Sequence, residues 1–254
     1  MADTTSSPTT GIEALKRHAV EHVLDMCMWG IRAVSIILTF AYFIPIIGNP
    51  YNAYYRVLLA NAAISAIRLH QRLPRPSISR DFFLKLFSED SCHYLLFSLI
   101  FFYVTPVTLV LLPVFLFCLI HFASYSLTLL DILGQNSWWG ARLLISLVEL
   151  QAGNILRLIS FTEIFLMPLV VMLLFLGRAG LFTPLVYFHF ITLRYSSRRN
   201  PHSRIMFREL RHAFESFVNK PSVPGIVRNI VLSVISIICR LAPQEVAAEG
   251  ARAQ

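Results

Sequence analysis

The sequence predicts an all-α, polytopic integral membrane protein. Of its 254 residues, 56% are hydrophobic and only 14% are charged, whereas soluble domains carry about a quarter charged residues. A chain this apolar could not cover itself with polar surface in water, so we expect lipid to surround much of it. Three apolar runs, residues 28–47, 94–130 and 158–193, alternate with more polar segments. They predict either three spans, or one span followed by two membrane hairpins.

Residues 1–27 form a polar N-terminal tail. A signal peptide begins with basic residues and continues with an apolar stretch, but acidic residues interrupt this tail, so we expect it to be retained. It contains the string HAVEH (18–22), which matches a zinc-protease pattern without an evident third ligand. We therefore expect no metal site, no catalytic residues and no cofactor, and the protein is not expected to be an enzyme.

The first apolar run, residues 28–47, is just long enough to span a bilayer, which takes about 20 residues. Arg32 lies near its start, where a long basic side chain can reach the lipid headgroups. A basic loop, residues 48–93, follows. Within it, apolar and polar positions recur at helical spacing over residues 52–72, and a second, short helix is expected over residues 79–90.

The second apolar run, residues 94–130, contains no Lys, Arg, Asp or Glu. As a single helix it would extend about 55 Å, whereas the hydrocarbon core is roughly 30 Å thick. Pro106 and Pro113 are the natural break points. Both a single tilted span and a hairpin of two short helices are compatible with this run.

The third apolar run, residues 158–193, is divided by the string GRAG at residues 177–180. The first half is long enough to span, but the second half has only 13 residues, too few to cross by itself. We expect the second half to be re-entrant or to lie against the first. The loop before this run, residues 131–157, contains two tryptophans that suit the membrane interface.

The distribution of charge predicts an orientation. Cytoplasmic loops carry an excess of Lys and Arg. The net charge is +8, and residues 194–240 carry nine basic against two acidic residues. We therefore expect residues 48–93 and the C-terminal region in the cytosol. The tail 1–27, with four acids and two bases, suits the lumen. Charge alone does not distinguish three spans from hairpins, because only loop 131–157 changes side.

The basic C-terminal region, residues 194–243, is expected to lie on the membrane surface, and residues 244–254 to be a disordered tail. From Met206 to Phe217, apolar residues recur in steps of three and four, which is typical of an interfacial amphipathic helix. Residues 224–241 form a second such candidate. Anionic lipid is a simpler partner than nucleic acid for positive charge beside apolar runs, and a groove on a partner protein is the alternative. The residues expected to contact membrane or a partner are Arg198, Arg199, Arg204, Met206, Arg208, Leu210, Arg211, Phe214, Phe217, Arg228 and Arg240.

Glu163 is the main charged group inside an apolar run, and such groups are functional candidates by default. Together with His121 and His189 it could form an ion path, which makes a channel, a transporter or a channel regulator the alternative function. Glu163 lies only five residues inside its run, so we expect it to be near the interface and hydrated.

Several strings resemble the transmembrane-protein-33 family, which includes the insect Krüppel-homologue-2 protein and the yeast pore-membrane Pom and Per proteins. These strings are RLHQRLP (68–74), EDSCHYLL (89–96), EIFLMP (163–168), LRYSSRRNP (193–201) and RLAP (240–243). The resemblance covers roughly residues 25–243 in the same order, without the N-terminal tail and the residues after Pro243.

The resemblance implies residence in the endoplasmic reticulum and nuclear envelope, association with reticulon-type proteins and a role in the tubular network. Vertebrate relatives are linked to the unfolded-protein response and to calcium release. Yeast relatives are linked to nuclear pores, with a C-terminal amphipathic region that engages membrane and an import receptor. That region corresponds here to residues 204–218 and 224–241. A membrane-organising scaffold is the leading hypothesis, and regulation of an ion channel in the endoplasmic reticulum through Glu163 is the alternative.

Overall fold

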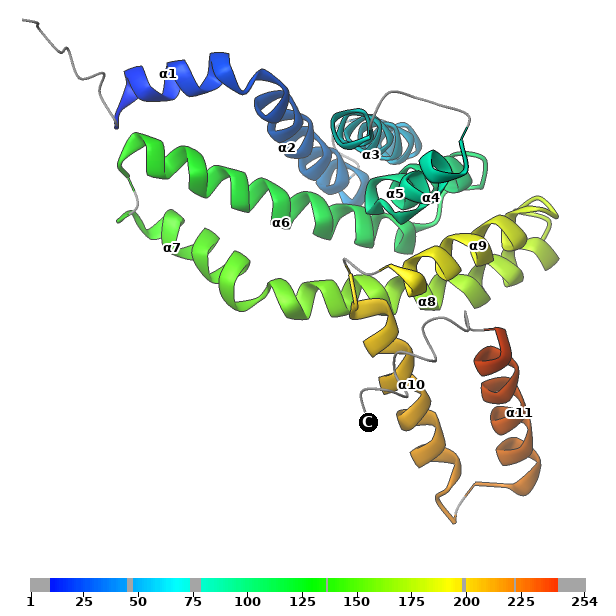
Figure 1. Ribbon diagram of the computed structural model, residues 1–254. Coiled ribbons are helices and arrows are strands. Elements are labelled where there is room, and N and C mark those ends of the chain that lie inside the picture. The colour runs from blue at the N-terminus through cyan, green and yellow to red at the C-terminus, as the bar shows by residue number, and fades with distance from the viewer. Residues whose placement is uncertain are drawn as a thin grey trace, which may run out of the picture.

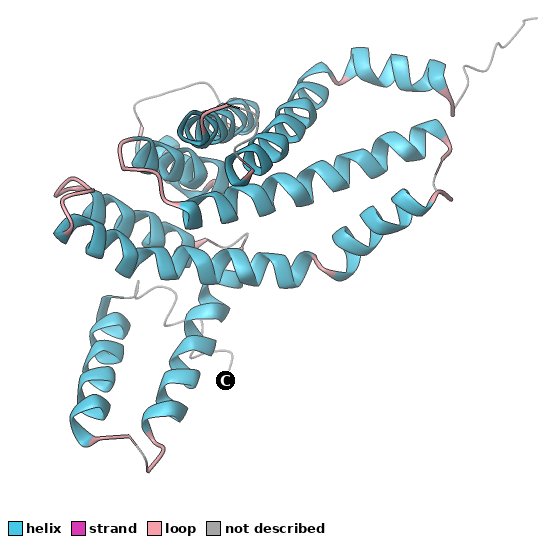
Figure 2. Cartoon of the chain, turned by 180° about the vertical axis from the view of Figure 1, so that it is seen from behind, coloured by secondary structure: helices cyan, strands magenta, loops and turns pink. Residues whose placement is uncertain are grey.

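The computed structural model describes residues 10–44, 48–73, 79–135, 137–197, 200–221 and 223–241. The described residues form eleven α-helices and a π-helical turn, with no strand among them, which confirms the all-α class (Figures 1 and 2). In chain order these elements are α1 (Ile12–Glu21), α2 (Val23–Phe43), α3 (Pro50–Arg72), α4 (Arg80–Ser88), α5 (Asp90–Phe102), α6 (Thr108–Leu133), α7 (Trp139–Ile145), the π-helical turn η1 (Ser146–Leu150), α8 (Ala152–Phe175), α9 (Thr183–Ser196), α10 (His202–Val218) and α11 (Gly225–Leu241).

Three helices, α2, α6 and α8, are long and apolar enough to cross a membrane. At 1.5 Å per residue they extend about 32, 39 and 36 Å, which matches or exceeds a hydrocarbon core of roughly 30 Å. Their outward surfaces remain apolar, as Ile37 on α2 (65% exposed) and Phe165 on α8 (56% exposed) illustrate. The length of these three helices and their apolar outward surfaces identify a multi-pass membrane protein.

The second apolar run is a hairpin with arms of unequal length. Helix α5 ends at Phe102 and α6 begins at Thr108, so the chain breaks around Pro106, one of the two expected positions. The rings of Tyr94 and Phe117 lie 4.6 Å apart, so side chains of the two arms are in contact. Pro113, the other expected break, lies inside a continuous α6, as neighbouring groups in a bundle can compensate for a proline within a helix. Of the two alternatives left open for this run, the break into two helices is found, but only α5 is short and α6 is long enough to span.

The third run is also a hairpin. Gly177, at the end of α8, has a φ of 68°, a left-handed conformation that glycine adopts without strain. Helix α9 then returns along α8, and the Tyr187 hydroxyl donates a hydrogen bond to the Glu163 carbonyl over 2.8 Å. The short second half therefore lies against the first half, which was one of the two expected arrangements.

The segment expected to be a basic loop contains a helix of the membrane bundle. Helix α3 packs along both α2 and α5. The Asn61 amide donates to the Ser98 hydroxyl of α5 over 2.8 Å, and the rings of Tyr55 and Phe102 lie 5.5 Å apart. Helices α2 and α3 thus form a first hairpin, and α3 runs antiparallel to α5.

All three hairpins turn at the same end of the bundle. At this end, the turn end, α2 passes into α3, α5 into α6, and α8 into α9. The hydroxyls of Tyr42 and Thr108 are 2.8 Å apart, which joins the first turn to the second. The Thr105 hydroxyl lies 3.5 Å from the carbonyl of Arg178, which joins the second turn to the third.

The opposite end of the bundle, the charged end, is where α5 begins and where α3 and α9 end. Helix α6 continues beyond it, since Phe117, well inside α6, lies 6.0 Å from the Arg194 guanidinium. Arg72 of α3 pairs with Glu89 over 3.2 Å, and Asp90 of α5 pairs with Arg194 of α9 over 3.2 Å. The backbone N–H of Gly11, just before α1, donates to Ile132 of α6 over 2.9 Å. The first described residues therefore lie beside the end of α6, beyond the level of Arg194.

The core of the bundle is aromatic. Phe97 of α5 has no exposed surface, and its ring lies 4.9 Å from Phe101 and 5.2 Å from Phe190 of α9. Because lipid tails are as apolar as these side chains, close packing stabilises such an interface more than exclusion from water does.

We predict that Phe97→Ala lowers the free energy of unfolding in detergent by about 3 kcal/mol, since it leaves a cavity among packed rings. The matched control is Leu99→Ala on the same helix. Leu99 is 48% exposed, and its loss should cost under about 1 kcal/mol. Equal effects of the two substitutions would contradict a core at Phe97.

Candidate functional site

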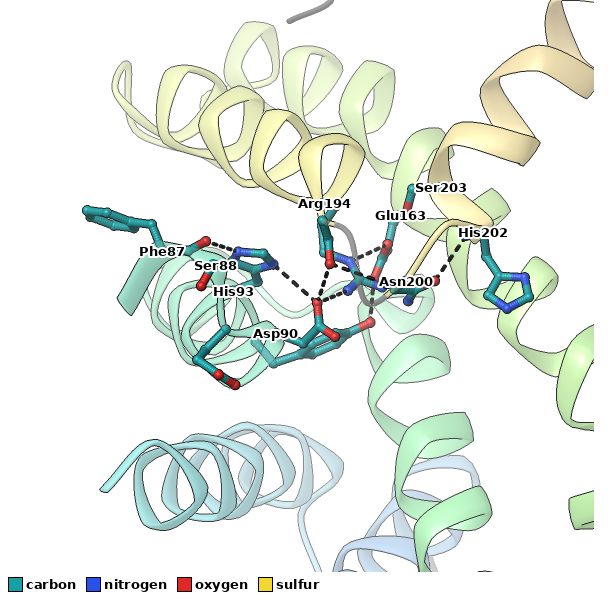
Figure 3. A network of polar contacts seen from close by, with 12 residues as sticks. Phe87, Ser88, Asp90, His93, Glu163, Arg194, Asn200, His202 and Ser203 are labelled. Atoms are coloured by element: carbon teal, nitrogen blue, oxygen red, sulfur yellow. Dashed lines mark hydrogen bonds and ion pairs between the residues drawn. The ribbon is translucent and has the colours of Figure 1, made fainter. Parts of the chain in front are cut away.

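A fully buried ion pair joins the two arms of the third hairpin. Glu163 of α8 and Arg194 of α9 are each 1% exposed, and Arg194 Nε donates to Glu163 Oε2 over 3.1 Å. Figure 3 shows the Arg194 side chain between Glu163 and Asp90. The pair lies toward the charged end of the bundle, because Asp90 is the first residue of α5.

Groups from two helices complete the surroundings of the pair. Asp90 Oδ1 accepts from Arg194 Nη1 over 3.2 Å and from the Ser197 hydroxyl over 3.0 Å. The Tyr94 hydroxyl donates to Glu163 Oε1, and the Arg194 guanidinium carbon lies 5.2 Å from the centre of the Tyr94 ring. One arginine thus ties α5, α8 and α9 together through two carboxylates and an aromatic ring.

The structure corrects the expected environment of Glu163. This side chain was expected to be hydrated, but it is buried in protein and paired. His189 is exposed on α9, and the ring of His121 stacks on Phe117 of its own helix, with centroids 6.3 Å apart. The three polar groups therefore lie in different surroundings instead of following one another along a path.

Sequence reasoning treated Arg194 only as the first residue of the basic C-terminal region. A signal for its pairing with Glu163 was present, since Glu163 precedes Gly177 by 14 residues and Arg194 follows Gly180 by 14 residues. A hairpin centred between the two glycines brings these side chains to the same level.

The C-terminal helices α10 and α11 extend away from the membrane bundle (Figure 1). Helix α10 is attached to α8 at its beginning, where the hydroxyls of Ser160 and Ser203 are 3.5 Å apart and Arg157 lies 3.6 Å from Glu209. Helix α11 folds back along α10, and the Arg228 Nε donates to the Val218 carbonyl over 2.9 Å.

The exposed surface of these two helices is strongly apolar. No residue of α11 is buried. The exposed large apolar side chains of α10 and α11 are Phe214, Phe217, Ile226, Val227, Ile230, Leu232, Val234, Ile237, Ile238 and Leu241. A patch of this kind on a folded chain marks a contact with membrane or with a partner.

Most of the residues expected to contact membrane lie on these two helices. On α10 they are Arg204, Met206, Arg208, Leu210, Arg211, Phe214 and Phe217, and on α11 they are Arg228 and Arg240. Arg198 and Arg199 lie outside the described residues. Arg211 is not free, because its Nε donates to Glu215 over 2.7 Å.

The string HAVEH lies on α1 and its C-terminal cap. His18 Nε2 is 3.1 Å from the Tyr125 hydroxyl of α6, and His22 is 3.9 Å from Asp25. Among the described residues there is no group of three His, Cys, Asp or Glu side chains that could hold a metal ion.

We predict that Glu163→Gln and Arg194→Met each lower the free energy of unfolding by about 3–5 kcal/mol, because each removes one partner of the buried ion pair. In the double variant neither charge remains, so it should lose much less than the sum of the two. The measurement is a double-mutant cycle on the full chain unfolded in detergent. Arg178→Met, on the exposed turn between α8 and α9, is the control for loss of an arginine. Strictly additive losses would show that the two side chains are not coupled.

Comparisons with known proteins extend along almost the whole chain. Krueppel homolog 2 of Drosophila melanogaster is 50% identical over 230 residues, which are 91% of this chain and 83% of that protein. Transmembrane protein 33 of Homo sapiens is 44% identical over 245 residues, covering 96% and 99% of the two chains. The Caenorhabditis elegans homolog of Transmembrane protein 33 is 31% identical over 233 residues, covering 91% and 86%. No solved structure matches the chain significantly.

The family described as Transmembrane protein 33/Nucleoporin POM33 matches residues 7–244. The match begins before Asp25, so the resemblance extends further toward the N-terminus than the shared strings indicated, and it includes α1. With this match and relatives at this identity, the chain belongs to the Transmembrane protein 33/Nucleoporin POM33 family.

Proposed function

We propose that this protein is a non-enzymatic organiser of the endoplasmic reticulum and nuclear envelope membrane, which inserts three hairpins from the cytosolic side. The observation that carries the proposal is the segregation of charge between the two ends of the bundle. The connecting segments at the turn end, residues 44–49, 103–107 and 176–182, contain a single charged residue, Arg178. The ends of α3 and α9 lie at the charged end, and basic residues follow both helices in the sequence.

The charge pattern supports a cytosolic position for the charged end, because Lys and Arg beside membrane segments favour that side. The N-terminal tail then lies in the cytosol as well, although its own charge suits the lumen. Its net charge is only −2, from four acids and two bases. The C-terminal segment of +7 from Arg194 to Arg240 outweighs it, and Asp and Glu contribute little to orientation.

This arrangement suggests how the protein acts on membrane shape. The cytosolic leaflet would accommodate the charged end of the bundle together with α10 and α11, which bring basic and apolar side chains to the same surface. The lumenal leaflet would accommodate only three tight turns. Unequal occupancy of the two leaflets favours curved membrane, as in tubules and at pore margins.

The proposed partners meet the protein at the basic surface of α10 and α11. They are anionic lipids, reticulon-type proteins, nuclear pore components and an import receptor. The family name, which includes the word nucleoporin, supports a location at the pore membrane. A transport path through Glu163 receives less support, because its carboxylate is occupied by Arg194 and Tyr94.

The proposed orientation predicts the accessibility of single cysteines introduced into a cysteine-free chain. In sealed microsomes, Thr10→Cys, Ser79→Cys and Ser137→Cys should all react with a membrane-impermeant maleimide from outside. Cysteine in place of Thr105, at the turn end, should react only after the membrane is opened. Protection of Thr10→Cys while Ser79→Cys reacts would place the two positions on opposite sides, and the three-hairpin arrangement would then be wrong.

Contact between the C-terminal helices and lipid can be tested with an environment-sensitive dye on Cys239, which is exposed on α11. In vesicles with anionic lipid the full-length protein should show blue-shifted dye emission. Phe217→Glu should shift the emission toward its value in water, because a charge on the apolar face opposes insertion. His212→Glu introduces the same charge at another exposed position of α10 and should have a much smaller effect. Equal shifts from the two variants would argue against insertion of this face.

A further inference from the structure

A polar cavity lies inside the membrane bundle, toward its charged end. Its volume is about 620 Å³, and it is bordered by α2, α3, α5 and α6. Three arginines line it, namely Arg32 of α2 with Arg68 and Arg72 of α3. Polar hydrogen-bonding side chains, Asn61 and Ser65 among them, complete the lining. The volume falls within the range of small-molecule sites, about 300–1,000 Å³.

The buried side chain of Arg32 is the strongest indication that the cavity binds a ligand. Arg32 belongs to a helix that can span the membrane, and it was expected to extend toward the lipid headgroups. Its side chain instead lines the cavity and is 4% exposed. Its buried Nη2 atom has no hydrogen-bond partner among the described residues. A buried and unpaired guanidinium is costly in a protein interior, so an anion in the cavity would stabilise it.

Arg68 adds a second positive charge to the same cavity. The positive charges of Arg32 and Arg68 repel each other. Asp25 attracts both, but it forms an ion pair with neither arginine. In the described part of the chain, no carboxylate forms an ion pair with Arg32 or Arg68.

The acidic residues at the cavity are already engaged with other groups. Glu89 pairs with Arg72 over 3.2 Å. Asp90 accepts hydrogen bonds from Arg194 and Ser197. Neither acid therefore takes the place of an anion beside Arg32 and Arg68, and the cavity retains uncompensated positive charge.

We propose that this cavity binds a phosphate group, carried either by the headgroup of an anionic phospholipid or by free phosphate. Guanidinium groups bind phosphate oxygens through strong, directional hydrogen bonds, and the Ser65 hydroxyl can donate a further one. Ile64 and Phe117 also line the cavity and can contact the apolar part of a lipid.

Full-length protein, purified and delipidated in a neutral detergent, provides the test. Its unfolding temperature is measured in the presence of short-chain phosphatidic acid, short-chain phosphatidylcholine or inorganic phosphate. Its affinity for each of the three compounds is measured as well. We expect phosphatidic acid to raise the unfolding temperature and phosphatidylcholine to do so much less. A shift with phosphatidic acid but not with inorganic phosphate identifies a lipid ligand, and equal affinity for the two identifies free phosphate.

Two variants locate the site. Arg32→Gln should weaken binding of phosphatidic acid by about tenfold or more, the effect of losing a charged hydrogen bond, and it should raise the unfolding temperature of the ligand-free protein because it removes an unpaired buried charge. Arg68→Gln, at a half-buried position, tests the site even if Arg32→Gln does not fold. Arg56→Gln, an exposed arginine of the same helix α3, is the matched control and should leave the affinity unchanged.

The proposal is overturned if neither phosphate compound stabilises the unaltered protein, or if Arg56→Gln weakens binding as much as Arg68→Gln. The cavity is formed by helices other than α10 and α11. Loss of phosphate binding should therefore leave the emission of a dye on Cys239 unchanged, which separates failure of this proposal from failure of the surface contact proposed for α11.

Discussion

The buried pair of Glu163 and Arg194 is the interaction around which the bundle is organised. Each charge would be unfavourable in this position without the other, because lipid and packed side chains solvate ions poorly. Their pairing sets the level at which α9 lies along α8. Asp90 and Tyr94 then bring α5 to the same point. A slip of one helical turn between α8 and α9, about 5.4 Å, would leave both charges buried and unpaired.

The pair of Glu163 and Arg194 also explains how α9, a helix too short to span a bilayer, is held within the membrane bundle. Helix α9 has only 14 residues, about 21 Å at 1.5 Å per residue, and cannot cross a bilayer by itself. It is held instead by side-chain contacts along α8 and α5, with Tyr187 and Phe190 in the aromatic core and Arg194 at the charged end. Helix α5, with 13 residues, is likewise held by contacts with its neighbours α3 and α9. All three hairpins, the two with a short arm included, turn at one end of the bundle.

Two buried arginines in this bundle have opposite surroundings. Arg194 is paired with carboxylates, whereas Arg32 ends in a cavity beside Arg68. Pairing within the protein holds helices in position. An unpaired guanidinium beside a cavity is suited to bind an anion from outside the protein. The first arrangement therefore supports the architecture, and the second provides a place where membrane composition could act on it.

The sequence by itself determined the fold class, the three apolar runs and the helices of the C-terminal region, because uncharged stretches and helical periodicity depend only on neighbouring residues. It also indicated the break at Pro106 and at Gly177, where the local backbone chemistry favours a turn. The spacing of Glu163 and Arg194 about the two glycines was compatible with their pairing but did not establish it, and nothing in the sequence showed that α3 joins the bundle or that Arg32 faces its interior. Those relations depend on which helices pack together and at which level, and contacts between residues 31 or more positions apart decide that, as the pairs Glu163–Arg194 and Asn61–Ser98 illustrate.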